Sequence, residues 1–163
     1  LHGLLGGDPD WPGAGALALA PVAFLWVLAF SVAGEETGWR GYLLPRLLAR
    51  TGPVAASLLL GSVWALWHLP LWALPGDFHA AIPVWLFAVQ ILAVSILYTW
   101  LWMASGGSLV LVHVFHAASN TTLGLLPLLP GEGADGTRPL VLAVALLCGL
   151  SALVALRLRR ADP

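Results

Sequence analysis

Side chains that can do chemistry occur in three short motifs of an otherwise apolar sequence. The first motif has two adjacent carboxylates, with a guanidinium four residues after the second. The next motif places an imidazole inside an apolar run, and the last has an imidazole and a carboxamide four residues apart. These residues are Glu35, Glu36, Arg40, His68, His116 and Asn120. Such groups are poorly tolerated in hydrocarbon and normally face a protein interior or a wet cavity. Together they are the components of a hydrolytic site.

The spacing of the acidic motif separates its two carboxylates by role. Glu36 and Arg40 are four residues apart on one helical face, where a carboxylate and a guanidinium can pair. Glu35 points about 100° away around the helix, so it is free for another role. A carboxylate outside an ion pair in an apolar pocket is suited to act as a general base on water. Alternatively, both carboxylates are helix-terminal charges at the interface, with Thr37 in an N-terminal turn.

The histidine motifs are consistent with two kinds of chemistry. His116 and Asn120 project from the same helical face, and both can donate hydrogen bonds to a developing oxyanion in a dry site. His113 shares part of that face, so His113 and His116 could instead ligate a metal ion. A lone histidine in an apolar helix, such as His68, is usually a hydrogen-bonded core residue. The residues alone leave these alternatives open.

Composition places the chain in the membrane. Of its 163 residues, 60% are hydrophobic and 9% are charged, and its mean hydropathy is +0.90. Soluble domains carry roughly 25% charged residues. All seven basic residues are Arg and the formal charge is −1, so there is no basic field for nucleic acid. The single cysteine, Cys148, excludes a disulfide framework and a Cys-rich metal site.

Hydropathy predicts an all-α, polytopic transmembrane helical bundle with about five spans, since roughly 20 apolar residues cross a bilayer. The predicted spans are about 15–34, 54–74, 82–104, 108–129 and 139–157. A shorter helix is expected over 36–50, broken near Pro45. The predicted organisation is a leader or loop over 1–14, one transmembrane domain over 15–158 and a cytoplasmic tail over 159–163. Because the chain starts at Leu1, we expect a fragment or processed form with further helices upstream.

Arginine bias predicts the orientation. With five alternating spans, the arginines after the first span and those after the last fall on one side, which should be cytoplasmic. These are Arg40, Arg46, Arg50, Arg157, Arg159 and Arg160. The composition is Ala/Leu/Gly-rich and free of Lys, which indicates a prokaryotic plasma membrane. His2 and His79 fall in loop sequence, and we do not expect them at the site.

The three motifs together resemble the CPBP family of intramembrane proteases. This family includes the type II CAAX prenyl endopeptidases and the bacterial Abi-type immunity proteins. The family pattern is Glu-Glu-x-x-x-Arg, Phe-x-x-x-His and His-x-x-x-Asn on successive helices. Here the matching residues begin at Glu35, Trp64 and His116, and the resemblance covers roughly residues 20–155. Trp64 stands where the family usually has Phe, so we expect an altered pocket shape beside His68.

The resemblance implies a role for each matching residue. Glu35 and His68 would activate the attacking water, and His116 and Asn120 would stabilise the oxyanion. Glu36 and Arg40 would hold the helix geometry, with Trp64 as supporting aromatic wall. The family is described both as zinc-dependent and as metal-free, and either mechanism is allowed. Zinc ligands would be Glu35, His68 and His116, which have suitable ligand types.

The expected function is therefore hydrolysis of a peptide bond in a membrane-associated protein or peptide, as CAAX-type processing or as bacteriocin immunity or maturation. The expected partners are that substrate and the lipid bilayer; the sequence does not define an oligomeric state. One alternative is a transporter with a Glu/His proton relay, although paired broken helices in corresponding halves are not evident. Another is an immunity protein that binds a peptide without cutting it.

Overall fold

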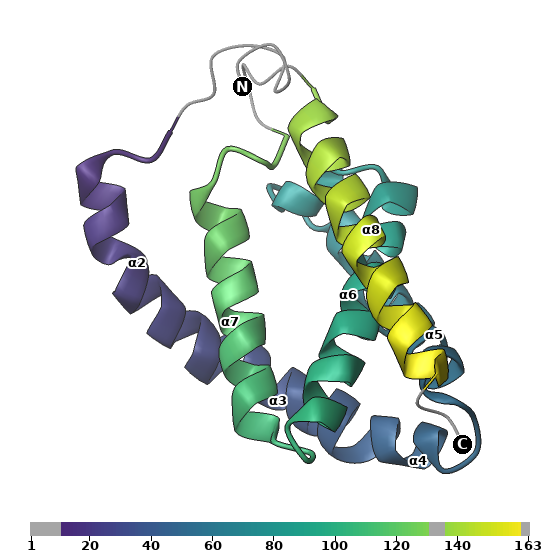
Figure 1. The fold of residues 1–163 in the computed structure, drawn as a ribbon. Helices are drawn as coiled ribbons and strands as arrows, with labels where there is room; N and C mark the ends of the chain where they lie inside the picture. Colours follow the sequence, from purple (N-terminus) through teal and green to yellow (C-terminus); the bar gives the residue numbers. More distant parts are fainter. Residues whose placement is uncertain (1–10, 131–135, 161–163) are drawn as a thin grey trace.

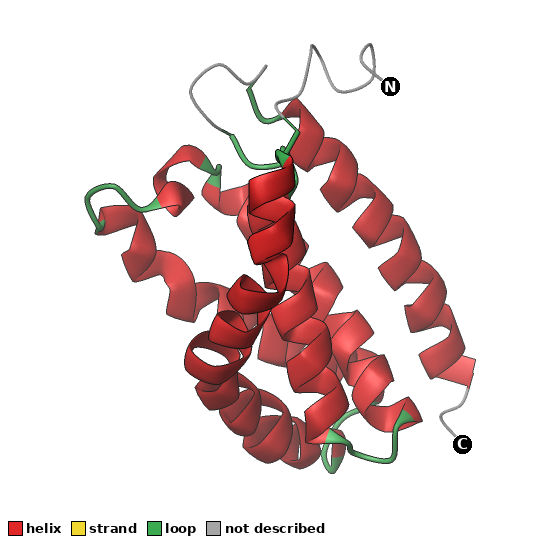
Figure 2. Ribbon diagram, turned by 90° about the vertical axis from the view of Figure 1, so that its left-hand side faces the viewer, coloured by secondary structure: helices red, strands yellow, loops and turns green. Residues whose placement is uncertain are grey.

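The computed structural model describes residues 11–130 and 136–160, and all regular structure in these ranges is helical (Figures 1 and 2). The predicted all-α class is confirmed. The α-helices are α2 (Ala14–Trp26), α3 (Ala33–Glu36), α4 (Leu44–Leu48), α5 (Pro53–His68), α6 (Val84–Ala104), α7 (Leu109–Leu125) and α8 (Arg138–Arg160). Two 3₁₀ turns, Leu69–Ala73 and Phe78–Ala81, lie between α5 and α6.

The first helical path runs from α2 to α4 through two π-helical segments. These segments, Val27–Val32 and Thr37–Leu43, flank the short α3 that carries both carboxylates. The path bends by 42° between Ala14–Phe30 and Ala33–Leu48. Near Pro45, where a break was predicted, the helix changes from π to α at Leu44, and Pro45 falls in the first turn of α4. The bend lies upstream, beside the acidic motif.

Helix length agrees with a membrane protein. Within the described residues, three helical stretches are long and apolar enough to span a bilayer: Pro53–Ala73, Val84–Ala104 and Arg138–Arg159. The bent path from Ala14 to Leu48 would be a fourth, and α7 is apolar but only 17 residues long. Large apolar side chains face outward, and Phe30, Val110 and Leu146 are 73%, 71% and 78% exposed. Such a surface is favourable in lipid and unfavourable in water.

Helices α5, α6 and α8 pack closely through small residues and serine hydroxyls. A Cβ atom at Gly61 would lie only 3.0 Å from the Cβ of Ser95, so glycine permits the close approach of α5 and α6. Ser95 donates a hydrogen bond to the carbonyl of Ser57 (2.8 Å), and Ser151 donates to that of Ala93 (2.8 Å). These bonds connect α6 to α5 and to α8, and the three helices form a fixed wall.

On the other side of the bundle, α7 packs against α2 and the first π-helical segment (Figure 1). His113 lies at this contact: its Nδ1 is 2.6 Å from the carbonyl oxygen of Leu109, and its Nε2 is 3.2 Å from that of Ala33. Helix α4 and the C-terminal end of α8 lie at one end of the bundle (Figure 1). This arrangement agrees with the predicted grouping of the arginines.

Candidate active site

A cavity of about 600 Å³ lies between the two sides of the bundle. Glu35, His68, His116 and Asn120 all line it, although they come from α3, α5 and α7. The structure therefore brings together the four residues predicted to be catalytic. The rest of the wall is largely apolar, with leucines, isoleucines and aromatic rings. Polar groups in such surroundings interact more strongly than in water.

A buried ion network lies behind the cavity wall and reaches the cavity through His116. Arg40 Nη1 donates to Glu36 Oε1 (2.8 Å), so the predicted pair between these residues is present. His116 Nδ1 donates to the same oxygen (2.7 Å) from α7. Glu36 and Arg40 are fully buried, and His116 is 3% exposed. One carboxylate thus connects the acidic motif to α7, and each partner satisfies a charge that would be costly to bury alone.

Aromatic rings complete the surroundings of Arg40. Its guanidinium carbon lies 4.6 Å from the ring centroid of Trp64 and 4.7 Å from that of Tyr98. Contacts of a cation with ring faces are stabilising when water is excluded. The rings of Trp64 and Tyr98 also pack against His116, with centroids 5.3 and 5.4 Å apart. The same two aromatic side chains therefore fix both the cation and the imidazole.

Glu35 is held by a contact that the sequence did not reveal. The indole N–H of Trp64 donates to Glu35 Oε2 (2.8 Å) across 29 residues of sequence. Glu35 is half-buried and its carboxylate lines the cavity, apart from the ion pair of Glu36. Trp64 was expected to be an aromatic wall; it also supplies a hydrogen-bond donor that phenylalanine lacks. The carboxylate is thus oriented by Trp64 and remains open to the cavity.

His68 ends α5 and presents one ring nitrogen to the cavity. Its Nδ1 lies 2.9 Å from the carbonyl oxygen of Trp64, one turn earlier. Because a carbonyl only accepts hydrogen bonds, this contact places a proton on Nδ1 and leaves Nε2 for the cavity. The ring also packs between Trp67 and Phe87, with centroids 5.0 and 5.1 Å away. These contacts fix both the tautomer and the orientation of the imidazole.

Helix α7 presents His116 and Asn120 to the cavity on the predicted common face. Ser119 and Leu123 line the same stretch of wall. His113 does not join them, because both its ring nitrogens face backbone carbonyls at the contact with the first helical path. The alternative of a metal site formed by His113 and His116 is therefore not supported by the position of His113.

The zinc ligands considered from the sequence do not come close enough together to share one ion in this structure. Glu35, His68 and His116 line one cavity. Nevertheless, no three His, Cys, Asp or Glu side chains in the described ranges come close enough to share a metal ion. A structural or catalytic zinc site needs at least three protein ligands near 2 Å from the ion. The arrangement does not fit zinc, and no step below depends on a metal.

His79 was assigned to a loop away from the site, but the structure places it in the cavity wall. It is 7% exposed and follows Asp77, which caps the short turn Phe78–Ala81. Asp77 Oδ1 accepts hydrogen bonds from the His79 backbone N–H (2.9 Å) and from Nδ1 (2.6 Å). These bonds, the backbone one first, lower the pKa of Asp77 below its usual value. In the sequence, only the Asp-x-His spacing of Asp77 and His79 could have indicated this contact.

The fold and the cavity define a helical membrane protein with a cluster of polar side chains in a largely apolar cavity between its helices. The family model for Rce1-like type II CAAX prenyl endopeptidases matches residues 17–122. The CAAX prenyl protease 2 of Methanococcus maripaludis is 36% identical over 112 residues, which are 65% of this chain. The match covers 41% of that relative, so the chain spans about two fifths of its length.

The chain belongs to the Rce1-like family, because the matched region covers more than half of it and contains all three motifs. The predicted resemblance to type II CAAX prenyl endopeptidases is confirmed. The match and the apolar helices together make it an integral membrane protein.

Proposed function

We propose that this protein is an intramembrane endopeptidase that hydrolyses a peptide bond in a membrane-associated protein. The observation that carries this proposal is the convergence of Glu35, His68, His116 and Asn120 on one cavity. A transporter with a Glu/His proton relay would use the same two groups, but it would not require the donors of His116 and Asn120 on the opposite wall. The comparisons support the same reading, since both name a CAAX prenyl endopeptidase or protease.

In the proposed reaction, Glu35 takes a proton from a water molecule as the water attacks the scissile carbonyl carbon. The Trp64 N–H orients this carboxylate through Oε2, and its other oxygen is available to the water. His68 Nε2 faces the same space, so it assists in orienting the water and in carrying its proton. The proton then passes to the leaving amine as the C–N bond breaks. At the end of the reaction, no side chain of the site carries a different charge from the one it started with.

The developing oxyanion would be stabilised by Asn120 and His116. The Asn120 side-chain amide is a donor in every protonation state. His116 donates a hydrogen bond from Nδ1–H to Glu36. Its Nε2 therefore donates a hydrogen bond only when the ring is doubly protonated. Glu36 carries one negative charge and contacts both Arg40 and His116 through Oε1, so an imidazolium at His116 would face this carboxylate. The role of the buried network is thus to support a charged donor at the cavity.

For the substrate, we propose a membrane-associated protein; the Methanococcus relative is named a CAAX prenyl protease. The predicted location is a prokaryotic plasma membrane, with Arg50 and Arg160 on the cytoplasmic side. A role in bacteriocin immunity or maturation would use the same hydrolytic site on a different peptide.

The decisive experiment is cleavage of a peptide library by the purified protein in detergent, with Glu35→Gln as the test variant. Loss of a general base typically lowers turnover about 10²–10⁴-fold. Turnover above about a tenth of the wild-type value would reject Glu35 as the base. The thermal unfolding of both proteins, followed by labelling of Cys148, controls for folding. A wild-type protein that binds peptides without cutting them would favour the immunity alternative.

A further inference from the structure

Helix α7 contacts the acidic motif and the residues just before it through two hydrogen bonds, and the proposed reaction uses only one of them. His116 Nδ1 donates to the carboxylate of Glu36 (2.7 Å). One turn earlier, His113 Nε2 lies 3.2 Å from the carbonyl oxygen of Ala33, which is within hydrogen-bond distance. Both contacts join α7 to α3, the short helix that also carries Glu35. The proposed base and the proposed oxyanion donors therefore sit on two helices that are bonded to each other at these two points.

The surroundings of His113 make its contact with α3 directional. Its Nδ1 lies 2.6 Å from the carbonyl oxygen of Leu109 in its own helix, and this contact fixes the plane of the ring. Carbonyl oxygens only accept, so the bond to Ala33 requires a proton on Nε2, and the doubly protonated ring donates to both carbonyls. The Ala33 carbonyl also accepts from Thr37 Oγ1 (2.7 Å), one turn later in the same helical path. His113 is thus the donor that reaches this carbonyl from another helix.

A second bond restricts a motion that the first one leaves open. A single contact lets one helix rotate against the other, whereas two contacts one turn apart fix both the spacing and the rotation. His113, His116 and Asn120 share one face of α7, because positions three, four and seven apart lie close together around a helix. The rotation fixed by the two histidines therefore sets the direction of the Asn120 amide.

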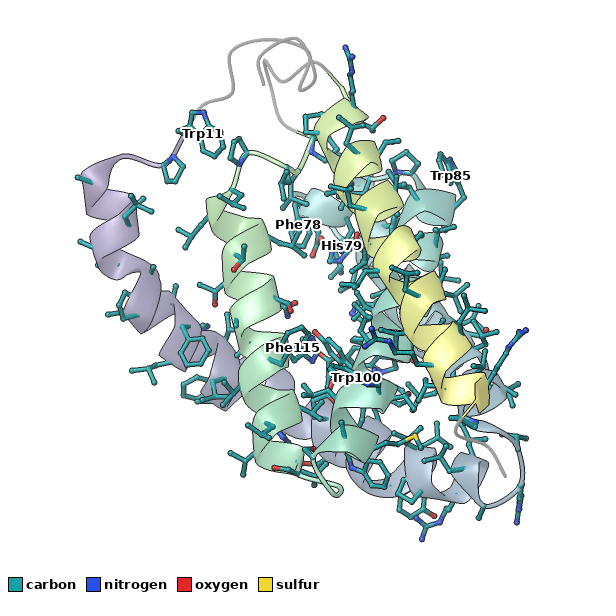
Figure 3. All side chains as sticks on the ribbon, viewed as in Figure 1. Trp11, Phe78, His79, Trp85, Trp100 and Phe115 are labelled. Carbon is teal, nitrogen blue, oxygen red and sulfur yellow. The ribbon has the colours of Figure 1, made fainter. Side chains whose placement is uncertain are left out.

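The contact on the other face of α7 is of a different kind. Phe115 extends from α7 toward α6 and packs edge-on against Tyr98, with ring centroids 5.4 Å apart (Figure 3). Two positions along a helix correspond to about 200°, so Phe115 and His113 lie on nearly opposite faces. Packed rings restrain rotation less tightly than a hydrogen bond, which weakens steeply when donor and acceptor are misaligned. The bond of His113 therefore supplies a restraint that the apolar contact lacks.

We propose that His113 is a positioning residue: its bond to the Ala33 carbonyl fixes α7 against α3. This bond sets the distance and the direction between the Glu35 carboxylate and the Asn120 amide. The inference rests on the proposed peptidase function and adds no group to the chemical step. His113 does not line the cavity, so it acts only through the helices that it joins. A misplacement of about 1 Å between reacting groups is enough to lower the rate about 10²-fold.

Two substitutions of His113 separate the bond between helices from the bond within α7. In His113→Gln the side-chain amide nitrogen reaches about as far as imidazole Nε2, so the bond to Ala33 is kept. In His113→Asn the amide nitrogen reaches only as far as Nδ1, so the bond to Leu109 is kept and the bond to Ala33 is lost. In peptide cleavage assays, His113→Gln should retain kcat within about threefold of the wild type, and His113→Asn should lower kcat about 10–100-fold with KM nearly unchanged.

Ser151→Ala is the matched control, because it removes the same kind of bond from the wall formed by α5, α6 and α8. Ser151 donates to the carbonyl of Ala93 on another helix, and neither residue lines the cavity. Its unfolding temperature should fall, while kcat and KM stay at the wild-type values. The inference would be overturned by an unchanged kcat in His113→Asn, by equal losses in His113→Gln and His113→Asn, or by a comparable loss in Ser151→Ala.

A measurement of helix geometry separates this inference from the peptidase proposal. Spin labels at two exposed positions, Gly38→Cys and Thr122→Cys in a Cys148→Ser background, report the distance between the second π-helical segment and α7. The protein with His113 and the His113→Gln variant should both give one narrow distance distribution, and His113→Asn should give a broader or displaced one. This pattern without peptide cleavage by the wild type would reject the peptidase and retain the fixing of α7 by His113. Identical distributions in all three proteins would overturn the inference.

Discussion

Two carboxylate–imidazole pairs each place a histidine in the wall of one cavity, and their surroundings differ. Glu36 and His116 are buried and are joined by Arg40, with a 2.7 Å contact across 80 residues of sequence. Asp77 and His79 are two residues apart, with a 2.6 Å contact, and the Asp77 side chain is 23% exposed. The first pair depends on the packing of distant helices. The second pair is formed by one turn and contacts water.

This difference teaches which contacts carry much of the stability and which carry little. A buried charge left without its partner is strongly destabilising, so loss of a partner in the inner network should lower the stability of the fold substantially. The outer pair is partly solvated, and its loss should be tolerated by the fold. Substitutions at the outer pair should therefore leave the packing of the helices intact.

The largest effect is expected from breaking the inner network. Arg40→Met should lower the free energy of unfolding by about 3–5 kcal/mol, because Glu36 keeps a buried charge without its cation. Thermal unfolding followed through Cys148 reactivity would measure this. The matched control is Arg46→Met: Arg46 is exposed and contacts only Tyr42. If both variants lost the same free energy of unfolding, the buried ion pair would contribute no more to stability than the exposed Arg46.

Loss of an oxyanion donor should affect catalysis with little effect on folding. Asn120→Ala is expected to lower kcat about 10²–10³-fold and to leave KM nearly unchanged. Chelators should not reproduce this defect. Metal analysis of the wild type and of His116→Ala, run beside their kinetics, tests the zinc alternative. Stoichiometric zinc that is present in the wild type and lost in His116→Ala would exclude the oxyanion role of His116.

A smaller effect is expected at the contact between Trp64 and Glu35. Trp64→Phe keeps an aromatic ring beside His116 and Arg40 but removes the donor to Glu35 Oε2. We expect kcat/KM to fall about tenfold, the value of one hydrogen bond to a charged group. Peptide cleavage assays would measure it. Trp67→Phe is the control, since Trp67 lines the cavity without a hydrogen bond to Glu35 among the described contacts. A larger loss in Trp67→Phe would argue against orientation of the base by Trp64.

The smallest effect should come from the outer pair. The pKa of Asp77 is lowered in the folded state by its hydrogen bonds from His79. A lowered carboxyl pKa gives stability above the unfolded-state pKa, and this stability is lost as the pH falls through the lower folded-state pKa. The unfolding temperatures of wild type and Asp77→Asn should differ slightly at about pH 5 and converge below about pH 3. A difference that grows on acidification would contradict the assigned direction.

Local patterns predicted a large part of this molecule. Apolar runs located the long helices, because roughly 20 apolar residues are needed to cross a bilayer. Spacing by four predicted the Glu36–Arg40 pair and the shared face of His116 and Asn120, because a helical turn fixes such neighbours. Near Pro45 the structure shows a change from π to α helix, whereas the 42° bend of the same path lies upstream.

Only the tertiary structure decided how these local pieces meet. The Trp64–Glu35 bond and the Glu36–His116 bond join residues 29 and 80 positions apart, so no short-range pattern contains them. The position of His79 was equally hidden, because burial of a loop residue depends on which helices pack beside it. The sequence determined which groups are available for chemistry and which helical face carries each. The packing of α3, α5 and α7 determined which of them share a cavity, because side-chain contacts between helices depend on crossing geometry that no single helix encodes.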